Sequence, residues 1–393
     1  MKLSAKSKAY MIPEYSLTGD LLSFLTCNLQ YRYQNKGTLP PSMPIQLWFG
    51  EFIHGIMEEA YNKWISEKLE FPWDWKSQIR PIEDMIDLRL QVRGLYPPTT
   101  QFYSTVNEKD VEITDEHERI ASGRAKTAIN TWGKHLFPLI DSAEVLIKGI
   151  RNMPSYDEDK SRSNYYGING VIDVLSSINI NEIQNDSKSN NEIINYLKAN
   201  EGFNKRIKSL KGEEYEIIID YKGMKRPTYG SDNWNHHEWQ ILTYSWLRSK
   251  QADSKTIVAG IIFYLNELVP SYEDLKSIQE DVKNGNNDVP ISSNDYELIT
   301  NWKDKKKYPD LSDKFKMDRS IRIINIDKKT INESLDKFDA VVEDIEESLI
   351  KETNGCKIKD AWKAEADERT CLACDFKTFC NNKHSKTKEI KIP

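Results

Sequence analysis

The chain has 393 residues, of which 38% are hydrophobic and 30% charged, so it can form about two or three domains or one elaborated α/β domain. A formal net charge of −6 argues against a protein that coats nucleic acid non-specifically, although local basic clusters could still bind phosphate. The longest apolar run, residues 257–265, is too short to span a membrane, and residues 1–16 lack the apolar stretch of a secretory signal. We therefore expect an intracellular, cytoplasmic protein without membrane contact.

The N-terminal part of the chain has two helical patterns. Residues 16–33 place leucines at helical spacing, and Cys27 lies two residues from that apolar stripe. A longer pattern covers residues 45–69 and places His54 and Glu58 one turn apart on one helix face. On its own, a histidine on a helix is more often structural than a metal ligand.

Strand candidates follow a less regular stretch. Residues 70–113 are rich in tryptophan and proline and are expected to form helices and loops, with a further helix over residues 115–136. Short apolar, β-branched runs then predict strands at residues 143–151, 165–178 and 214–221.

Two of these strands carry charged side chains in unusual places. Asp173 lies in the middle of its strand, where a buried carboxylate needs a partner. Asp220 and Lys222 follow an isoleucine run and are two residues apart, so their side chains project from the same face of the strand. Burying a carboxylate beside an ammonium group is costly unless a metal ion or a phosphate binds there. The alternative is a strand that ends in an ordinary solvated Asp and Lys.

A polar segment separates the last two of these strands. Residues 179–212 are too many for a hairpin loop and are expected to be an insertion with about two short helices. A helix over residues 234–248 then places Gln240 and Tyr244 one turn apart. Another strand is expected over residues 257–266.

The C-terminal part begins with residues 270–318, which are polar and contain a lysine-rich run at 303–307 that we expect to be solvated. A last strand over residues 320–326 leads into an acidic amphipathic helix over residues 331–353. A basic tail at residues 383–391 ends the chain.

The cysteines are unevenly distributed. Cys27 lies near the start and Cys356 stands alone, whereas Cys371, Cys374 and Cys380 form a C-x2-C-x5-C motif. In a chain without a secretory signal, this pattern favours metal or iron–sulfur ligation over disulfides.

In chain order, the motifs are C, G-x3-H, G-x-I-D, D-x-K, Q-x3-Y and C-x2-C-x5-C. This ordered set resembles the PD-(D/E)xK nuclease superfamily, and more narrowly its iron–sulfur branch, which includes AddB-type nuclease domains, the CRISPR-adaptation exonucleases and exonuclease V. The resemblance implies a restriction-endonuclease-like α/β core, with a central mixed sheet flanked by helices. The regions would be a helical N-terminal part at 1–142, the nuclease core at 143–270 with its insertion at 179–212, a polar insertion with the last strand and amphipathic helix at 271–353, and an Fe–S-ligating segment with a basic tail at 354–393.

The resemblance also implies roles for the charged residues. The catalytic divalent ion would be bound by His54, Asp173 and Asp220, helped by the backbone carbonyl of Tyr221. Lys222 would orient or activate the attacking water and offset the charge of the phosphorane. The carboxylate of D-x-K is Asp here rather than the commoner Glu, which shortens its reach but keeps hard oxygen ligands.

Further roles follow from the same resemblance. Gln240 and Tyr244 would lie beside the site and hold DNA or the lysine. Apart from the resemblance, the basic residues near the proposed site, Lys225, Arg226 and the group at 205–211, could follow the phosphate backbone. A 4Fe–4S cluster would be ligated by four cysteines: Cys27, Cys371, Cys374 and Cys380.

The implied function is that of a Mg²⁺- or Mn²⁺-dependent deoxyribonuclease, expected to act as an exonuclease on single-stranded DNA or DNA ends. It would serve DNA repair, recombination or CRISPR-type defence, with DNA as its partner and a helicase or other DNA-processing protein as a candidate second partner. Carboxylates suit Mg²⁺, and an imidazole among the ligands favours Mn²⁺ or tolerates it.

Three alternatives remain open. Cys371, Cys374, Cys380 and His384 could form a zinc knuckle, with Cys27 merely buried. The chain could be a non-catalytic DNA-end-binding or assembly subunit that keeps the fold; such a subunit would be expected to lose a carboxylate or the lysine. It could also be a structural α/β protein in which the motifs are coincidental.

Overall fold

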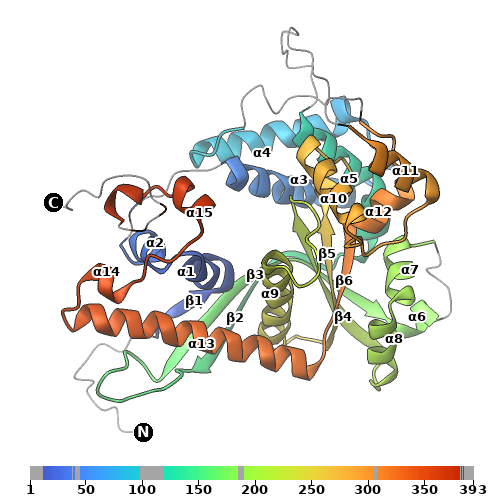
Figure 1. The fold of residues 1–393 in the computed structure, drawn as a ribbon. Coiled ribbons are helices and arrows are strands. Elements are labelled where there is room, and N and C mark those ends of the chain that lie inside the picture. The colour runs from blue at the N-terminus through green and yellow to red at the C-terminus, as the bar shows by residue number, and fades with distance from the viewer. Residues whose placement is uncertain are drawn as a thin grey trace.

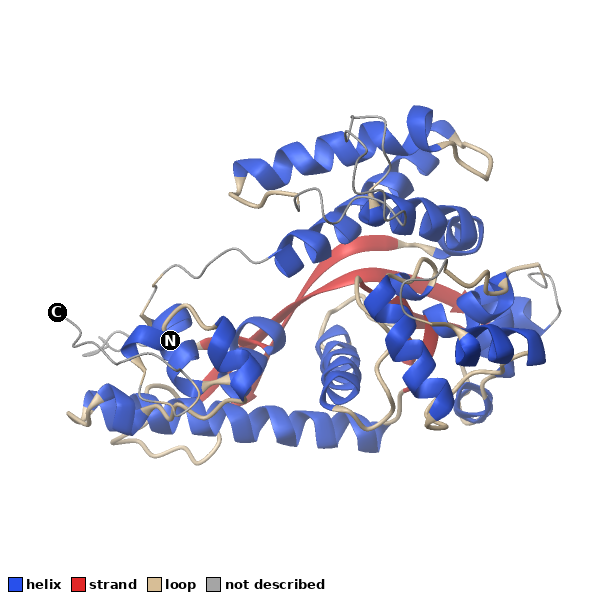
Figure 2. Cartoon of the chain, turned by 45° about the horizontal axis from the view of Figure 1, so that its top comes forward, coloured by secondary structure: helices blue, strands red, loops and turns tan. Residues whose placement is uncertain are grey.

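The computed structural model describes residues 12–37, 39, 45–97, 119–184, 190–303, 308–380, 382 and 384. Its centre is a six-stranded mixed sheet with helices on both faces (Figures 1 and 2). All five predicted strands are present, and their ends lie within two residues of the predicted ones. Among the described helices, none combines the length and the apolar character needed to cross a membrane.

The longest strand, β3 (Tyr165–Asn179), organises one half of the sheet. It pairs antiparallel with β2 (Ser142–Asn152) along one edge. Its other edge is shared by β1 (Glu14–Ser16), which is parallel to it, and by β4 (Glu214–Lys222), which is antiparallel. The sequence analysis missed β1, because three residues are too few to show a strand pattern.

The other half of the sheet is buried on both faces. β4 pairs parallel with β5 (Ile257–Tyr264), all of whose residues are buried, and β5 pairs antiparallel with β6 (Ile321–Asn325). Because parallel neighbours cannot be joined by a tight hairpin, a crossover is needed, and α9 (Asp232–Arg248) provides it.

Two helical layers enclose the sheet (Figure 2). On one face, α3 (Ile45–Glu67) and α5 (Ile120–Leu136) pack on β4 and β5, and α4 (Arg80–Val92) packs on α3. On the other face lie α9 and the long amphipathic α13 (Lys328–Thr353). The described part of residues 70–113 adds only a helical turn, Trp75–Ile79, before α4.

The insertion after β3 contains three short helices, whereas about two were predicted. They are α6 (Ile180–Gln184), α7 (Glu192–Ala199) and α8 (Glu201–Lys208). The asparagines of this polar segment begin two of these helices, because the Asn191 and Asn200 side chains accept backbone N–H bonds and cap α7 and α8.

Residues 270–318 are more ordered than their polar composition suggests. They form α10 (Tyr272–Lys283), α11 (Ser293–Asn301) and α12 (Asp313–Ser320), each with a serine N-cap. These helices have a small core of their own, made of Leu275, Ile278, Val282, Ile299, Trp302, Leu311 and Phe315. Residues 304–307 of the lysine-rich run lie outside the described residues, as does the basic tail apart from His384.

The single helix predicted over residues 16–33 is wrong. The chain instead forms a π-helical turn and then two short helices, α1 (Leu22–Thr26) and α2 (Asn28–Tyr31), which are separated by Cys27. Cys27 is extended, with φ −167° and ψ 114°. The break has a tertiary cause, because the N–H of Leu29 bonds to the carbonyl of Lys363 at 3.1 Å instead of continuing a helix.

The C-terminal segment packs on these N-terminal helices (Figure 1). Trp362 is fully buried and contacts the rings of Phe24 and Tyr31 at centroid distances of 6.2 and 6.1 Å. Nearby, the buried hydroxyl of Tyr15 in β1 donates a hydrogen bond to Glu346 of α13. The two ends of the described chain therefore form one packed unit.

Candidate active site and cysteine pocket

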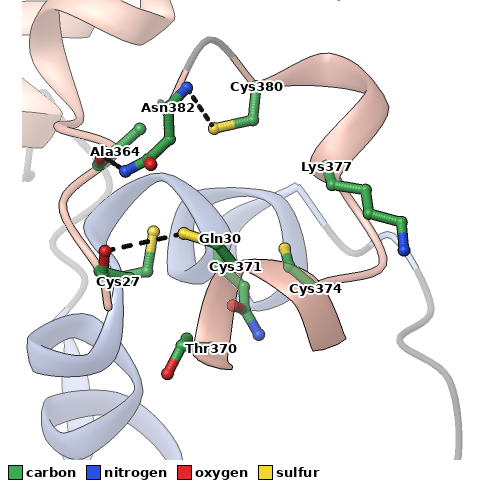
Figure 3. Close-up of a pocket in the computed structure, with 10 residues that line it drawn as sticks. Cys27, Gln30, Ala364, Thr370, Cys371, Cys374, Lys377, Cys380 and Asn382 are labelled. Carbon is green, nitrogen blue, oxygen red and sulfur yellow. Dashed lines mark hydrogen bonds between the residues drawn. The ribbon is translucent and has the colours of Figure 1, made fainter. Parts of the chain in front are cut away.

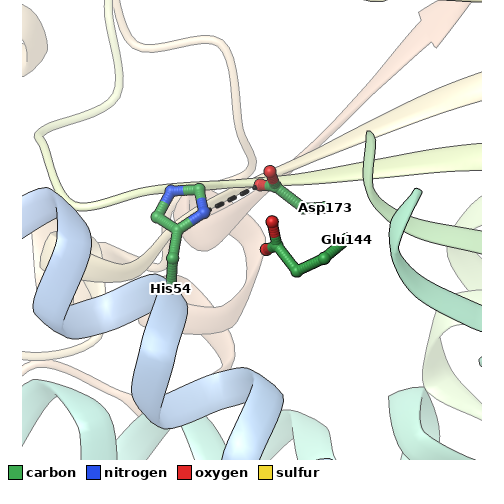
Figure 4. A group of neighbouring side chains, drawn as sticks. All are labelled: His54, Glu144 and Asp173. Carbon is green, nitrogen blue, oxygen red and sulfur yellow. Dashed lines mark ion pairs between the residues drawn. The ribbon is translucent and has the colours of Figure 1, made fainter. Parts of the chain in front are cut away.

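A histidine and a carboxylate from different layers meet where β3 and β4 run side by side. His54 of α3 places Nδ1 3.3 Å from Oδ2 of Asp173 on β3 (Figure 4). The same Asp173 oxygen accepts a 2.9 Å hydrogen bond from the backbone N–H of Tyr221 on β4. The Asp173 side chain is only 10% exposed, so these contacts fix a nearly buried carboxylate.

A second set of contacts holds the D-x-K residues. The Lys222 ammonium lies 2.7 Å from Asp220 Oδ2 and donates a 2.9 Å hydrogen bond to Oε1 of Gln240. Gln240 closes the triangle, because its Nε2 donates to Asp220 Oδ1 at 3.1 Å. The strand therefore does not end in a solvated Asp and Lys; Asp220 is only 3% exposed.

Tyr244 lies one turn beyond Gln240 on α9 and is buried. Its ring lies against Gly170 of β3, where an added Cβ would come within 2.6 Å of the ring. Gly170 therefore has a packing reason to be glycine, and it lies three residues before Asp173. The structure thus brings Asp173, Asp220, Lys222 and the two α9 residues of the Q-x3-Y motif into one region.

Glu144 of β2 is a site residue that sequence reasoning missed. Its carboxylate, Nδ1 or Nε2 of His54 and a carboxylate oxygen of Asp173 all lie within 4.8 Å of one another, and the described residues contain no other such group of metal-ligand side chains. In the sequence, Glu144 looks like an ordinary outward-facing residue of an edge strand. Only the register of β2 with β3 could have revealed it.

The carboxylates of Glu144, Asp173 and Asp220 place more negative charge in this region than the neighbouring cations balance, and the pKa values reflect this. Partial loss of hydration, and then the charge of Asp173, raise the pKa of Glu144 to about 7. Burial likewise raises the pKa of Asp220 to about 6, although Lys222 opposes this shift. Burial would lower the pKa of His54, but Asp173 outweighs it and raises that pKa to about 9. A proton on His54 thus partly balances charge that a divalent cation could balance instead.

The donor set fits Mg²⁺ or Mn²⁺. It combines carboxylate oxygens with one imidazole, as these ions accept. Asp220 Oδ2 is a fully buried oxygen that accepts no hydrogen bond of good geometry from the described residues, although Lys222 is close. A cation beside Asp173 and Asp220 would satisfy that oxygen.

Four cysteines gather far from these carboxylates in sequence, in the unit formed by the chain ends. Cys27, Cys371, Cys374 and Cys380 line one pocket (Figure 3). Backbone N–H groups point at two of the sulfurs, from Phe376 to Cys374 and from Asn382 to Cys380, each at 3.4 Å.

The remaining thiol and the C-terminal histidine do not join this group. Cys356 packs at the edge of the apolar core that α9 and α13 form with their face of the sheet. His384 is not among the residues that line the cysteine pocket. Loss of hydration raises the pKa of Cys27, Cys371 and Cys374, which favours the protonated thiols in the metal-free protein.

The spacing of these sulfurs differs from that of a zinc site. A tetrahedral zinc ion with Zn–S bonds of about 2.3 Å holds its sulfurs about 3.8 Å apart. Within the described part of the chain, no three ligand atoms of the four cysteines and His384 lie within 4.8 Å of one another. As placed here, these side chains therefore do not already form a tetrahedral zinc site.

One basic residue was placed wrongly by sequence reasoning. Arg226 is 6% exposed and forms a two-point ion pair with Asp288, so it is not available to bind a DNA backbone. Lys225 is available at the surface, where it bonds to Ser277.

One family model matches part of this chain. Residues 202–381 match the family model of the PD-(D/E)XK nuclease superfamily, whereas a search of curated proteins finds no match. The matched segment begins in α8 and includes Asp220, Lys222, Gln240 and Tyr244 with the last three cysteines of the pocket. The mixed sheet flanked by helices agrees with the restriction-endonuclease-like fold of that superfamily. The PD-(D/E)XK nuclease superfamily match thus covers residues 202–381, whereas Asp173 of β3 and His54 of α3 precede the matched segment.

Proposed function

We propose that the chain is a divalent-metal-dependent deoxyribonuclease that hydrolyses phosphodiester bonds, acting as an exonuclease on single-stranded DNA or DNA ends. The observation that carries this proposal is the closed triangle of Asp220, Lys222 and Gln240 beside the Asp173–His54 pair. Buried carboxylates beside an ammonium group and an imidazole at one point of a sheet are costly to maintain for structure alone, which favours a functional site.

In this proposal, His54, Asp173 and Asp220 hold the divalent ion, with the carbonyl of Tyr221 as a further ligand. The ion supplies charge neutralisation and lowers the pKa of bound water. Lys222 is the one cation of the triangle, and it stabilises negative charge that develops on the phosphate or orients the attacking water.

Gln240 and Tyr244 are proposed to position the catalytic side chains rather than to take part in the reaction themselves. Gln240 accepts from Lys222 and donates to Asp220, so it fixes the ammonium group relative to the carboxylate. Tyr244 supports Gln240 from the next turn of α9. Neither the carboxylates nor the lysine are missing, which supports a catalytic rather than a purely DNA-binding role.

The cysteine pocket is proposed to hold a 4Fe–4S cluster. In such a cluster each thiolate binds a different iron, so the sulfurs stand further apart than around a single zinc ion. The proposal rests on the four cysteines that line one pocket and on the backbone N–H groups directed at two of their sulfurs. The cluster would join α1 and α2 to the C-terminal segment.

The nuclease proposal is tested by cleavage of end-labelled linear single strands, linear duplexes and covalently closed circular single strands, each with Mg²⁺, Mn²⁺ or EDTA. We expect linear substrates to shorten only with metal and circles to survive. Cleavage of circles would overturn the exonuclease assignment, and cleavage in EDTA would overturn the metal requirement.

The cluster is tested on anaerobically purified protein. We expect a broad absorption band near roughly 400 nm and about four irons per chain. A colourless protein that contains one zinc per chain would overturn the cluster. DNA repair, recombination or CRISPR-type defence is the proposed setting, with a helicase as the proposed partner.

A further inference from the structure

Glu144 has a backbone conformation that is unusual for a residue inside a β-strand. Its φ is +51°, in the left-handed region that residues with a Cβ rarely adopt. The paired positions of β2 and β3 run from Ala143 with Val174 to Val145 with Ile172 and skip the position between them. Glu144 and Asp173 stand opposite each other at this skipped position. The strand is therefore distorted at the point where it passes the proposed metal site.

The distorted backbone of β2 directs the Glu144 side chain toward His54 and Asp173. The Glu144 carboxylate reaches the same point as His54 and Asp173, and Figure 4 shows it facing both. It lies in an open groove whose other lining residues include Glu58. Within the described part of the chain, the Glu144 side chain forms no hydrogen bond or ion pair that would offset the unfavourable backbone.

We infer that Glu144 is an additional ligand of the divalent ion, an inference that rests on the proposed nuclease function. An octahedral ion with bonds of about 2.1 Å holds adjacent ligand atoms about 3 Å apart and opposite ones about 4.2 Å apart. The group of Glu144, His54 and Asp173 needs only small side-chain adjustments to reach these spacings. Asp220, whose buried Oδ2 lies 2.7 Å from the Lys222 ammonium, is not a member of this group of three, so the place of Glu144 rests on His54 and Asp173.

Glu144 also differs from the other proposed ligands in where it lies. Asp173 and Asp220 approach the ion from within the sheet, whereas Glu144 is exposed and approaches from the solvent side. It therefore occupies a coordination position that water would otherwise take, and it adds a negative charge to the site. Both effects strengthen binding of a divalent cation.

The experiment measures Mn²⁺ binding by calorimetry to the full chain without DNA, together with the melting temperature of the metal-free protein. Glu144→Gln keeps the size of the side chain but removes its charge, and we expect Mn²⁺ binding at least tenfold weaker. Glu58→Gln is the matched control from the same groove, and its Mn²⁺ affinity should stay within twofold of that of the wild type. Glu144→Gly removes the cost of the left-handed backbone, so its metal-free melting temperature should equal or exceed that of the wild type while Mn²⁺ binding weakens.

The possible results distinguish the proposed ligand role of Glu144 from the proposed nuclease function. Wild-type affinity in Glu144→Gln, with an active wild-type enzyme, would overturn the role of Glu144 and leave the nuclease proposal standing. A lower metal-free melting temperature in Glu144→Gly would also overturn it, because the conformation would then serve folding. A wild-type protein that neither binds Mn²⁺ nor cleaves DNA would overturn the proposed function itself.

Discussion

Lys222 is the residue whose removal tests the catalytic site most directly, because Lys222→Met keeps much of the volume and deletes only the charge. The ammonium group contacts Asp220 and Gln240. We expect cleavage to fall by at least about 10²–10³-fold, the loss typical when a preorganised charge-stabilising group is removed. The effect on stability can be worked out separately from the pKa of Asp220.

In the metal-free protein, Asp220 has a pKa of about 6, raised by burial, whereas an unfolded Asp has a pKa of about 3.9. A raised carboxyl pKa means that stability is highest below about pH 4 and declines as the pH rises through about 6. Without Lys222 the pKa rises further, so the decline continues at higher pH. The variant should therefore be close to the wild type at pH 5 and become progressively less stable than it as the pH rises above about 6, by on the order of 1 kcal/mol at pH 7 and by more at pH 8.

The assay is urea denaturation in EDTA at pH 5, 7 and 8, with cleavage measured on the same preparations. Lys225→Met is the matched control for the denaturation series alone, because Lys225 is a surface lysine near the end of β4 that bonds to Ser277, and it is itself a candidate DNA contact. A stability difference that does not change between pH 5 and pH 8 would refute the account of Asp220. Undiminished cleavage by Lys222→Met would refute the assignment of the site.

Two further substitutions test the supporting structure. Cys374→Ser should remove iron from the purified protein and lower its melting temperature, whereas Cys356→Ser, outside the pocket, should do neither; an iron-loaded Cys374→Ser of unchanged melting temperature would contradict the role of the pocket. Gly170→Ala should cost about 1–3 kcal/mol and reduce cleavage, because the new methyl group displaces the Tyr244 ring. Gly50→Ala is its control, since nothing lies within 4 Å of the added atom, and equal behaviour of the two variants would contradict the packing argument.

The sequence could predict those parts of the site whose reactive side chains lie close together on one strand or on one helix. The isoleucine run of β4 delivers Asp220 and Lys222 together, and helical spacing places Gln240 and Tyr244 on one face of α9. These residues lie within 25 positions of one another, so no long-range information was needed.

The parts that could not be predicted depend on contacts between distant segments. Glu144 acquires its place only through the register of β2 with β3 and through its left-handed backbone. The break at Cys27 goes against a good helical leucine pattern, because the Leu29 N–H pairs with Lys363. The burial of Arg226 likewise depends on Asp288, which lies in a different part of the chain.

Because the two chain ends pack together, the N-terminal segment cannot complete its contacts until the C-terminal segment has been synthesised. The hydrogen bond from Tyr15 to Glu346 spans 331 residues. At a synthesis rate of about 5–20 residues per second, roughly 17–66 s pass between the appearance of these two partners on the ribosome. During that interval β1 and the aromatic side chains that follow it have no α13 to cover them. The N-terminal helices, although made first, are therefore among the last parts of the molecule that can reach their final environment.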